Sequence, residues 1–192
     1  MDNEIPNASF FPYAAFLRGI NVGGKQIKMD KLKDAFNAWG YHNVSTILAS
    51  GNIIFDTQSA DPKAVRQIIT NGIKTAFGFE VSVFIRSIEE LMLLTAKNPF
   101  AGFNESAQTK LYVTFLDQKV IPEIKIPYQS LGEKLVILSV TDREIFSVVT
   151  LTMDFGTSNM MVFLEKEFGS ELTTRNWNTT IKILDLYQKT HR

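Results

Sequence analysis

Two polar stretches carry the residues best suited to chemistry, and one of them lies close to the C-terminus. It runs Thr173-Thr174-Arg175-Asn176-Trp177-Asn178-Thr179 and is followed by Ile181 and Leu184 at the spacing of one helical face. Polar residues this dense at a helix start either hold an anion or cap the helix. An N-cap at Thr174 accounts for one of them. Others in the stretch are therefore candidates for binding a ligand: Arg175, Asn176, Asn178 and Thr179.

The other stretch, Gly19-Ile20-Asn21-Val22-Gly23-Gly24-Lys25, has the spacing G-x-x-x-x-G-K of a phosphate-binding P-loop. Gln26 stands where that loop needs a hydroxyl to hold magnesium, and the expected helix N-cap is the acidic Asp30. We therefore expect no hydrolysis of nucleoside triphosphates. Adjacent glycines still allow a close backbone approach to an anion. The candidates for phosphate binding here are Arg18, Asn21, Gly23, Gly24 and Lys25.

Some of these residues have competing explanations. The lysines of segment 25–33 supply local positive charge for a phosphate or a nucleic-acid backbone, but lysines on a helix are more often simply solvated. Trp177 is either a core anchor or a platform for stacking, and we favour the core anchor because its helical face continues into apolar positions. Arg18 follows an apolar strand, so its guanidinium needs a carboxylate, carbonyl groups or a ligand.

Composition narrows the classes of function. The 192 residues include 20 Lys+Arg and 20 Asp+Glu, so no global charge favours nucleic acid or an anionic membrane. The absence of cysteine excludes disulfides, thiolate metal sites and a thiol nucleophile. The only histidines, His42 and His191, have no metal-site or nucleophile-elbow spacing, so we expect no metal and assign no cofactor and no catalytic residue. The acidic, polar N-terminus and the lack of a long apolar run predict a cytoplasmic protein with no membrane partner.

The hydrophobic pattern predicts an α+β protein whose first half is ferredoxin-like. Caps and helical periodicity predict helices from Asp30 to Trp39 and from Asp61 to Phe77, each stopped by a glycine. Apolar runs predict the strands 13–17, 44–49, 53–55 and 81–85. The resulting order of strand, helix, two strands, helix and strand is the ferredoxin-like pattern.

The second half is expected to be a related but less regular α+β subdomain. Ser87 caps a helix that ends before Asn98, and the polar loop 101–109 is the expected domain boundary. Strands are predicted at 110–116, 134–139 and 144–150, with a helical turn near 118–124 and helices at about 157–168 and 175–188. The predicted organisation is a loose extension at 1–12, a first subdomain at 13–100 and a second at 101–192.

Four short motifs follow one another along nearly the whole chain from Tyr13. They are Phe16-Leu17-Arg18-Gly19-Ile20-Asn21-Val22-Gly23-Gly24, Ala49-Ser50-Gly51-Asn52-Ile53-Ile54-Phe55, Asn98-Pro99-Phe100 and the stretch 173–179. Together they resemble domain of unknown function family 1697 (DUF1697). The resemblance implies an α+β cytoplasmic bacterial protein, often a stand-alone domain. It implies no known activity and no assigned catalytic residues.

We expect the site where the loop 18–25, the turn 50–52 and the stretch 175–179 come together, which adds Ser50 and Asn52 to the candidates. In a ferredoxin-like half, however, the end of the first strand and this turn can lie at opposite ends of the sheet. The leading function is binding of a phosphorylated small molecule or nucleotide, with Arg18, Lys25 and Arg175 supplying charge. The alternatives are a nucleic-acid-binding module that uses segment 25–33 and a protein-interaction domain without a ligand.

Overall fold

The computed structural model describes residues 9–21, 23–48, 50–130 and 132–191, which fall into two compact units. The first unit extends to Glu89 and includes the C-terminal residues from Thr190, and the second runs from Glu90 to Lys189. Most of the predicted extension 1–12 lies outside the described residues. The same is true of Val22, in the loop 18–25 that we call the glycine loop, and of Ala49 at the end of a predicted strand. The loop 101–109 lies inside the second unit.

The first unit is an antiparallel sheet with two helices. Its elements are β1 (Phe11–Arg18), α1 (Met29–Ala38), β2 (His42–Ile47), β3 (Asn52–Thr57), α2 (Pro62–Phe77) and β4 (Ser82–Ser87). The strands lie in the order β2-β3-β1-β4, and every neighbouring pair is antiparallel. The α+β class is confirmed, and the predicted succession of strands and helices is observed. The ferredoxin-like assignment of this half stays a prediction.

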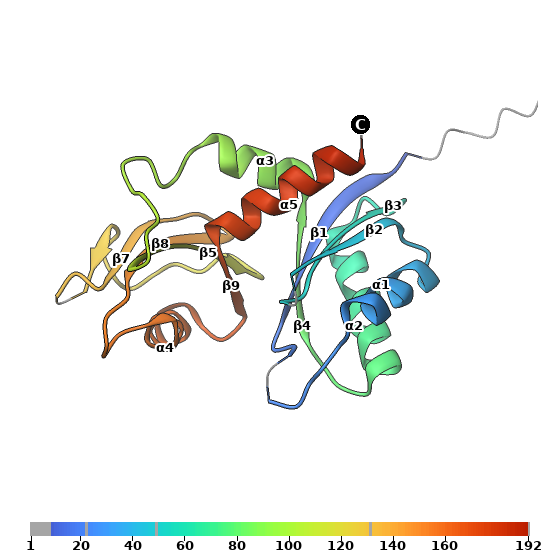
Figure 1. Ribbon diagram of the computed structural model, residues 1–192, viewed down its shortest axis with the longest axis horizontal. Coiled ribbons are helices and arrows are strands. Elements are labelled where there is room, and N and C mark those ends of the chain that lie inside the picture. The colour runs from blue at the N-terminus through green and yellow to red at the C-terminus, as the bar shows by residue number, and fades with distance from the viewer. Residues whose placement is uncertain (1–8, 22, 49, 131, 192) are drawn as a thin grey trace, which may run out of the picture. The chain divides into compact units, whose positions relative to one another are not determined.

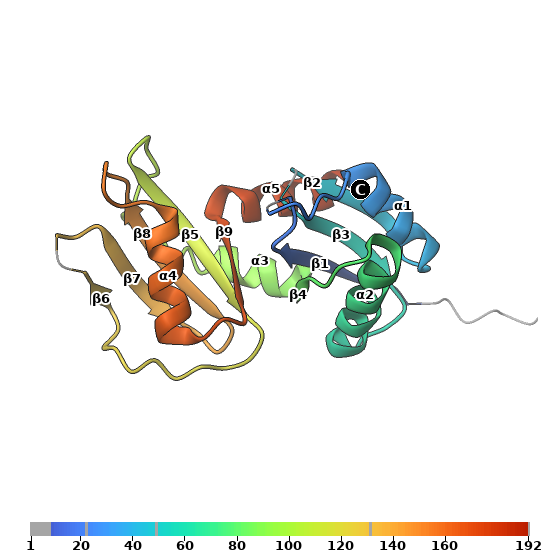
Figure 2. The same ribbon diagram turned by 90° about the horizontal axis from the view of Figure 1, so that it is seen from below.

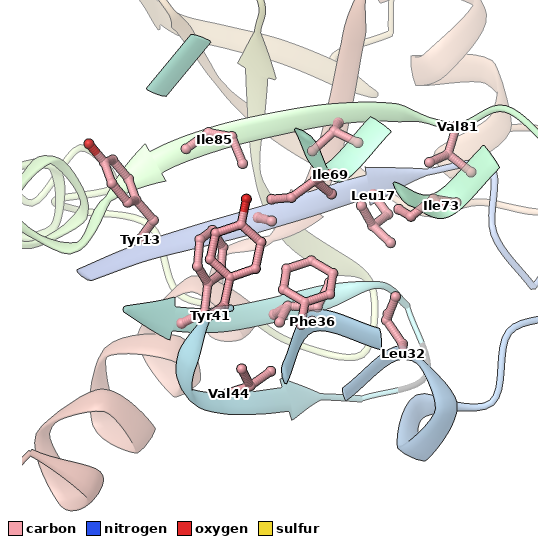
Figure 3. Close-up of a cluster of buried hydrophobic side chains, with 14 of the residues drawn as sticks. Tyr13, Leu17, Leu32, Phe36, Tyr41, Val44, Ile69, Ile73, Val81 and Ile85 are labelled. Carbon is pink, nitrogen blue, oxygen red and sulfur yellow. The ribbon is translucent and has the colours of Figure 1, made fainter. Parts of the chain in front are cut away.

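Both helices of this unit cover the same face of the sheet (Figure 1). Side chains such as Leu17 of β1, Phe36 of α1 and Ile69 of α2 meet there and are almost completely buried (Figure 3). Each such side chain contributes about 1.5–3 kcal/mol relative to an exposed one, so this core fixes the helices on the sheet. The polar faces of α1 and α2 are left at the surface.

The ends of these helices show which sequence signals were sufficient. α1 ends in a Schellman motif, because the Tyr41 N–H donates to the Phe36 carbonyl at 3.2 Å and the Gly40 N–H to the Asn37 carbonyl at 3.1 Å. Asp61 caps α2 as predicted, since its carboxylate accepts from the Lys63 N–H at 2.9 Å. The predicted start of α1 was wrong.

α1 begins at Met29 with Lys28 at the N-cap position, and Asp30 lies inside its first turn. The N-cap makes no side-chain hydrogen bond. An aspartate in the first turn is favourable through the helix dipole without being the cap, so the same residue type fits both positions.

The second unit is a five-stranded antiparallel sheet in the order β6-β7-β8-β5-β9. The remaining elements of the chain are α3 (Ile88–Ala96), β5 (Thr109–Leu116), β6 (Tyr128–Gln129), β7 (Leu135–Val140), β8 (Glu144–Thr150), α4 (Thr157–Phe168), β9 (Leu172–Asn176) and α5 (Trp177–Thr190). α4 lies across one face of the sheet (Figure 2), where Met160, Leu164 and Phe168 pack on Leu116 and Ile145.

Sequence and structure differ at several points in this unit. The helical turn expected near 118–124 is not formed, and the short strand β6 was not predicted. The N-cap of α4 is Gly156. The largest difference concerns the motif 173–179, which we expected to open the last helix. Most of it is the edge strand β9, and the helix starts only at Trp177.

Candidate functional site

The loop between β1 and α1 lies at the surface, and its conformation is stabilised by hydrogen bonds within the loop and by two buried side chains. Ile20 and Ile27 are buried and fasten it to the core. Between them, the Asn21 side-chain oxygen accepts a hydrogen bond from the Ile27 N–H at 3.0 Å, and the Asn21 N–H donates to the Lys25 carbonyl at 2.6 Å. Asn21 is therefore a brace within the loop.

The glycines of this loop serve its backbone path. Gly23 and Gly24 have φ values of 58° and 85°, in the region that favours glycine. A Cβ atom at either residue would meet no other atom within 4 Å, so the space beside both residues is open. The backbone of both glycines is exposed, and their role in binding a ligand stays a prediction.

The turn 50–52 lies at the same end of the sheet as this loop. The Leu17 N–H at the end of β1 donates to the Gly51 carbonyl at 2.8 Å, and Phe16 is opposite Asn52 in the antiparallel β1–β3 pair. The objection that loop and turn could lie at opposite ends of the sheet is thereby removed. A Cβ at Gly51 would be 2.6 Å from Ile20 Cδ1, so the turn also packs closely against the loop.

Asn52 itself is fully buried. Its Nδ2 donates to the Ile47 carbonyl at 3.0 Å and to Ser50 Oγ at 2.9 Å. These contacts close the turn between β2 and β3. Asn52 is a structural residue of the turn, and we leave it out of the proposed binding surface, whereas Ser50 is exposed.

Lys25 connects the glycine loop to a pocket that the sequence did not indicate. Its Nζ donates to the Glu80 carbonyl at 3.2 Å and lies 5.8 Å from the centre of the Phe79 ring. Next to this contact is a pocket of about 370 Å³ between α2 and the start of β4. Its lining is polar except for Val81, and consists of Gln67, Thr70, Asn71, Lys74, Glu80, Val81 and Ser82.

The charges at this pocket are arranged around Glu80. Lys74 Nζ lies 2.6 Å from Glu80 Oε1, and this hydrogen bond, with the attraction of the Lys74 charge and more weakly that of Lys25, lowers the pKa of Glu80. The same hydrogen bond raises the pKa of Lys74. Two ammonium groups therefore flank one carboxylate, and the cluster carries an excess of positive charge.

A weak signal for this pocket was present in the sequence. Gln67, Thr70, Asn71 and Lys74 follow the helical spacing i, i+3, i+4 and i+7 on α2. Such a polar stripe is the ordinary surface of an amphipathic helix, so it gave no reason to expect a pocket. Only the neighbouring edge strand β4 turns the stripe into a hollow.

The two arginines expected to share a site belong to different units. Arg18 is the last residue of β1, opposite Ser82 of β4, in the first unit. Arg175 is in β9 of the second unit, where its Nη1 donates to Thr173 Oγ1 and to the Thr174 carbonyl, each at 2.9 Å. Burial lowers the pKa of Arg175 to about 10, so its guanidinium is still protonated at neutral pH. A site shared by the two arginines stays a prediction.

The asparagines of the motif 173–179 have partners within the second unit. Asn176 Oδ1 accepts from the Asn178 N–H at 2.9 Å, which makes Asn176 the cap of α5 in place of Thr174. Both side-chain amides also donate to the Glu105 carboxylate, that of Asn176 at 2.9 Å, and Lys110 lies 3.6 Å from it. The unusual pair of asparagines is thus accounted for by a capping bond and a carboxylate of the chain itself.

Trp177 packs on other side chains of this unit, and Thr179 is buried. The Trp177 ring is only partly exposed and meets the buried rings of Phe100 and Phe146 edge-on, at centroid distances of 5.2 and 6.3 Å. Thr179, a candidate for binding a ligand, is only 8% exposed. The buried face of α5 is broader than predicted, because Thr179 and Thr180 pack inward beside Ile183 and Leu184.

A comparison with protein-family models finds a match over residues 11–146 to a family described as protein of unknown function (DUF1697). The chain belongs to the DUF1697 family. The matched region contains three of the four motifs on which the resemblance rested, and the motif 173–179 lies beyond it.

A search of the curated proteins finds no match to this DUF1697 member. Among solved structures it resembles the conserved bacterial protein SP0830 from Streptococcus pneumoniae, with a TM-score of 0.67 at 18% sequence identity. The alignment covers 94% of this chain and 99% of that one. At this identity the likeness establishes a shared fold and carries no assignment of activity.

Two further properties can be stated for the residues that the structure describes. None of their helices combines the length and the apolar character needed to cross a membrane. Likewise, no three of their His, Asp or Glu side chains are grouped so that they could hold a metal ion.

Proposed function

We propose that this DUF1697 protein binds a phosphorylated small molecule or a nucleotide in the pocket between α2 and β4, with the glycine loop at its rim. The observation that carries the proposal is the contact of Lys25 with the Glu80 carbonyl, because it joins the side chain at the end of the glycine loop to a residue that lines the polar pocket. A volume of about 370 Å³ lies within the range of small-molecule sites. The cytoplasmic, bacterial setting predicted from the sequence forms part of this proposal.

Charge supports an anionic ligand. Lys25 and Lys74 flank Glu80, whose single carboxylate is already neutralised by Lys74. A phosphate beside both ammonium groups would accept charge-assisted hydrogen bonds, which are about twice as strong as neutral ones. The open backbone at Gly23 and Gly24 can approach a phosphate oxygen closely because neither residue has a side chain.

The remaining lining residues suit a ligand with several hydrogen-bonding groups. Gln67 and Asn71 provide carboxamides, and their side chains are joined at 3.0 Å by a bond from Gln67 Nε2 to Asn71 Oδ1. Thr70 and Ser82 add hydroxyl groups, each of which can both donate and accept. Sugar hydroxyls, whether of a sugar phosphate or of a nucleotide ribose, match this set.

The test is calorimetric titration and thermal unfolding of the full chain with inorganic phosphate, hexose phosphates, nucleoside mono- and triphosphates, and short oligonucleotides. A ligand at a hundred times its dissociation constant should stabilise the protein by about 2.7 kcal/mol. Lys25→Met and Lys74→Ala should each weaken binding about 10-fold or more, because a hydrogen bond to a charged group contributes about 1.5–3 kcal/mol. Lys63→Ala is the matched control, since it removes an exposed lysine from the first turn of the same helix.

The proposal is wrong if no phosphorylated compound binds, or if Lys25→Met and Lys74→Ala bind as the parent does. Nucleic-acid binding through segment 25–33 would appear instead as affinity for the oligonucleotides that grows with their length and falls steeply with salt. The existing ion pair of Lys31 with Asp34, at 3.5 Å, already neutralises part of that segment.

A further inference from the structure

A chain of hydroxyl, imidazole and carboxylate groups lies in the first unit, away from the pocket described above. His191 Nε2 lies 2.9 Å from Asp56 Oδ2, and His191 Nδ1 lies 3.0 Å from Thr190 Oγ1. Asp56 is in β3 and is 5% exposed, whereas Thr190, the last residue of α5, is exposed. Asp56 and His191 are 135 positions apart, so sequence spacing gave no sign of this arrangement.

The carboxylate determines which imidazole nitrogen is basic. Asp56 Oδ2 accepts a hydrogen bond, so the His191 nitrogen that faces it, Nε2, carries the proton in the neutral ring. In this tautomer Nδ1 carries an electron pair and can accept a hydrogen bond from the Thr190 hydroxyl, 3.0 Å away. This division of roles, in which a carboxylate orients an imidazole that can remove a hydroxyl proton, is the one that activates a nucleophile in hydrolases on unrelated folds.

Asn43 holds the carboxylate in place, and the backbone is distorted to bring it there. Its Nδ2 donates to Asp56 Oδ2 at 2.6 Å. The pairing of β2 with β3 shifts register between His42 and Ser45, and Asn43 within this irregularity has a φ of 50°. Bulges are frequent beside active sites because they redirect a side chain, and positive φ in a residue other than glycine is strained. The other oxygen of Asp56, Oδ1, is buried without a hydrogen-bond partner in the described part of the chain.

This chain of groups opens onto its own pocket. A hollow of about 380 Å³ lies where α1 meets the edge strand β2, and Thr190 and Asn43 both line it. Lys33 and Asn37 of α1 line it as well, together with Val44 and Ser45. An ammonium group and a carboxamide at the same pocket are the kinds of donor that stabilise an oxyanion.

We propose that this pocket is an acyl-transfer site in which Thr190 is the nucleophile, His191 its general base and Asp56 the positioning residue. The substrate class is a small ester or thioester with a polar acyl group, since Val44 is the only apolar lining residue. Thr190 Oγ1 forms a bond to the acyl carbon while its proton passes to His191 Nδ1. The bond to the leaving alcohol or thiol breaks, and that group takes the proton from His191. Water then forms a bond to the acyl carbon as its proton passes to the same nitrogen. The bond from that carbon to Thr190 Oγ1 breaks, and Oγ1 takes the proton from His191, which releases the acid and restores the threonine.

The test uses a fluorophosphonate, which reports an activated hydroxyl whatever the natural substrate is. Thr190 Oγ1 forms a bond to phosphorus, the P–F bond breaks, fluoride leaves and the hydroxyl proton passes to His191. Intact mass and peptide mapping of the full chain should show one adduct at Thr190. Thr190→Val should abolish labelling, Thr190→Ser should retain it, and His191→Gln should slow it about 100-fold or more. His42→Gln is the matched control, because His42 lies opposite Asp56 in the β2–β3 pair, has no role in this chain of groups and should leave labelling unchanged.

The role of Asp56 is tested by a measurement that would not change if Asp56 only stabilised the fold. Nitrogen chemical shifts of His191 should show Nε2 protonated and Nδ1 unprotonated in the parent protein, and Asp56→Asn should change that distribution and slow labelling. Turnover of p-nitrophenyl acetate should follow the same order of variants. Absence of an adduct at Thr190, or equal labelling rates in the parent and in His191→Gln, would overturn the proposal.

Discussion

Gly72, in the middle of α2, allows a test of how the helices pack on one another. A Cβ atom built at this position would lie 2.6 Å from Cε2 and Cζ2 of the Trp39 ring and 3.0 Å from its Cδ2. Trp39 is the C-cap of α1, and its ring is also 5.2 Å from that of the fully buried Phe36. The ring cannot retreat toward Phe36, so Gly72→Ala must displace it outward.

The expected change in the free energy of unfolding combines two opposing effects. Replacing a mid-helix glycine by alanine stabilises a helix by about 0.5–1 kcal/mol. Forcing a methyl group into a packed contact destabilises by about 1–3 kcal/mol, including part of the aromatic contact with Phe36. Overpacking should win, and Gly72→Ala should destabilise the protein by about 1 kcal/mol. In a Trp39→Ala background the contact is absent, so Gly72→Ala should instead stabilise by about 0.5–1 kcal/mol.

The assay is urea unfolding followed by circular dichroism at 222 nm, because one background lacks Trp39. The coupling energy between the two sites should be about 2 kcal/mol, well above the error for independent sites. Thr75→Ala is the matched control, because Thr75 is exposed on the same helix and should give the same small gain in both backgrounds. The reasoning is refuted if Gly72→Ala stabilises the parent protein as much as it stabilises Trp39→Ala.

Three other predictions concern single side chains. Trp177→Ala should lower the free energy of unfolding by about 2–3 kcal/mol, which is less than the loss expected on truncating a fully buried tryptophan. In a Trp39→Phe background the fluorescence emission of Trp177 should be blue-shifted. Red-shifted emission would contradict the packing of Trp177 on its aromatic neighbours. Asn176→Ala should lower thermal stability by about 1 kcal/mol through loss of the α5 cap, while an unchanged midpoint would mean that its bond to Asn178 does not stabilise the helix. Burial raises the pKa of Tyr41 to about 12, so its contribution to stability should be complete below pH 10 and be lost as pH rises through 12. Absorbance at 295 nm should show a late ionisation that Tyr41→Phe removes, and an unchanged late ionisation in Tyr41→Phe would disprove this.

Sequence signals were sufficient to predict a helix end or a strand wherever the residue type involved has one local role. Asp61 before a proline and Gly40 before Tyr41 act through bonds within a few positions of the chain, so the sequence contains the whole arrangement. The same holds for the apolar strands of the first sheet, whose succession was predicted correctly. These features depend on periodicity and caps, which are local by nature.

The motif 173–179 was misassigned because two local preferences compete in it. Thr173 and Thr174 are β-branched and favour a strand, yet threonine is also a good N-cap, and a helical face follows directly. Pairing with β5 makes this segment a strand. β5 and β9 pair over five positions, and the hydroxyl groups of Thr114 and Thr174 are hydrogen-bonded at 2.7 Å. No pattern within the motif reveals a partner strand some 60 residues away.

The two pockets could not be predicted from the sequence, and the reason lies in what makes a pocket. The core face of the first sheet is filled by α1 and α2, so on that side a hollow can form where the polar side of a helix meets an edge strand. Both pockets described above are of this kind, one at β4 beside α2 and the other at β2 beside α1. The sequence of each helix has the periodicity of an ordinary amphipathic helix. Its polar side becomes part of a pocket only because of the edge strand that the strand order places beside it. The two pockets also differ in chemistry, since one gathers ammonium groups and the other joins an imidazole to a buried carboxylate. Variants at Lys25 or Lys74 should therefore leave fluorophosphonate labelling of Thr190 unchanged, and Thr190→Val should leave phosphate binding unchanged, so that either proposal can fail without the other.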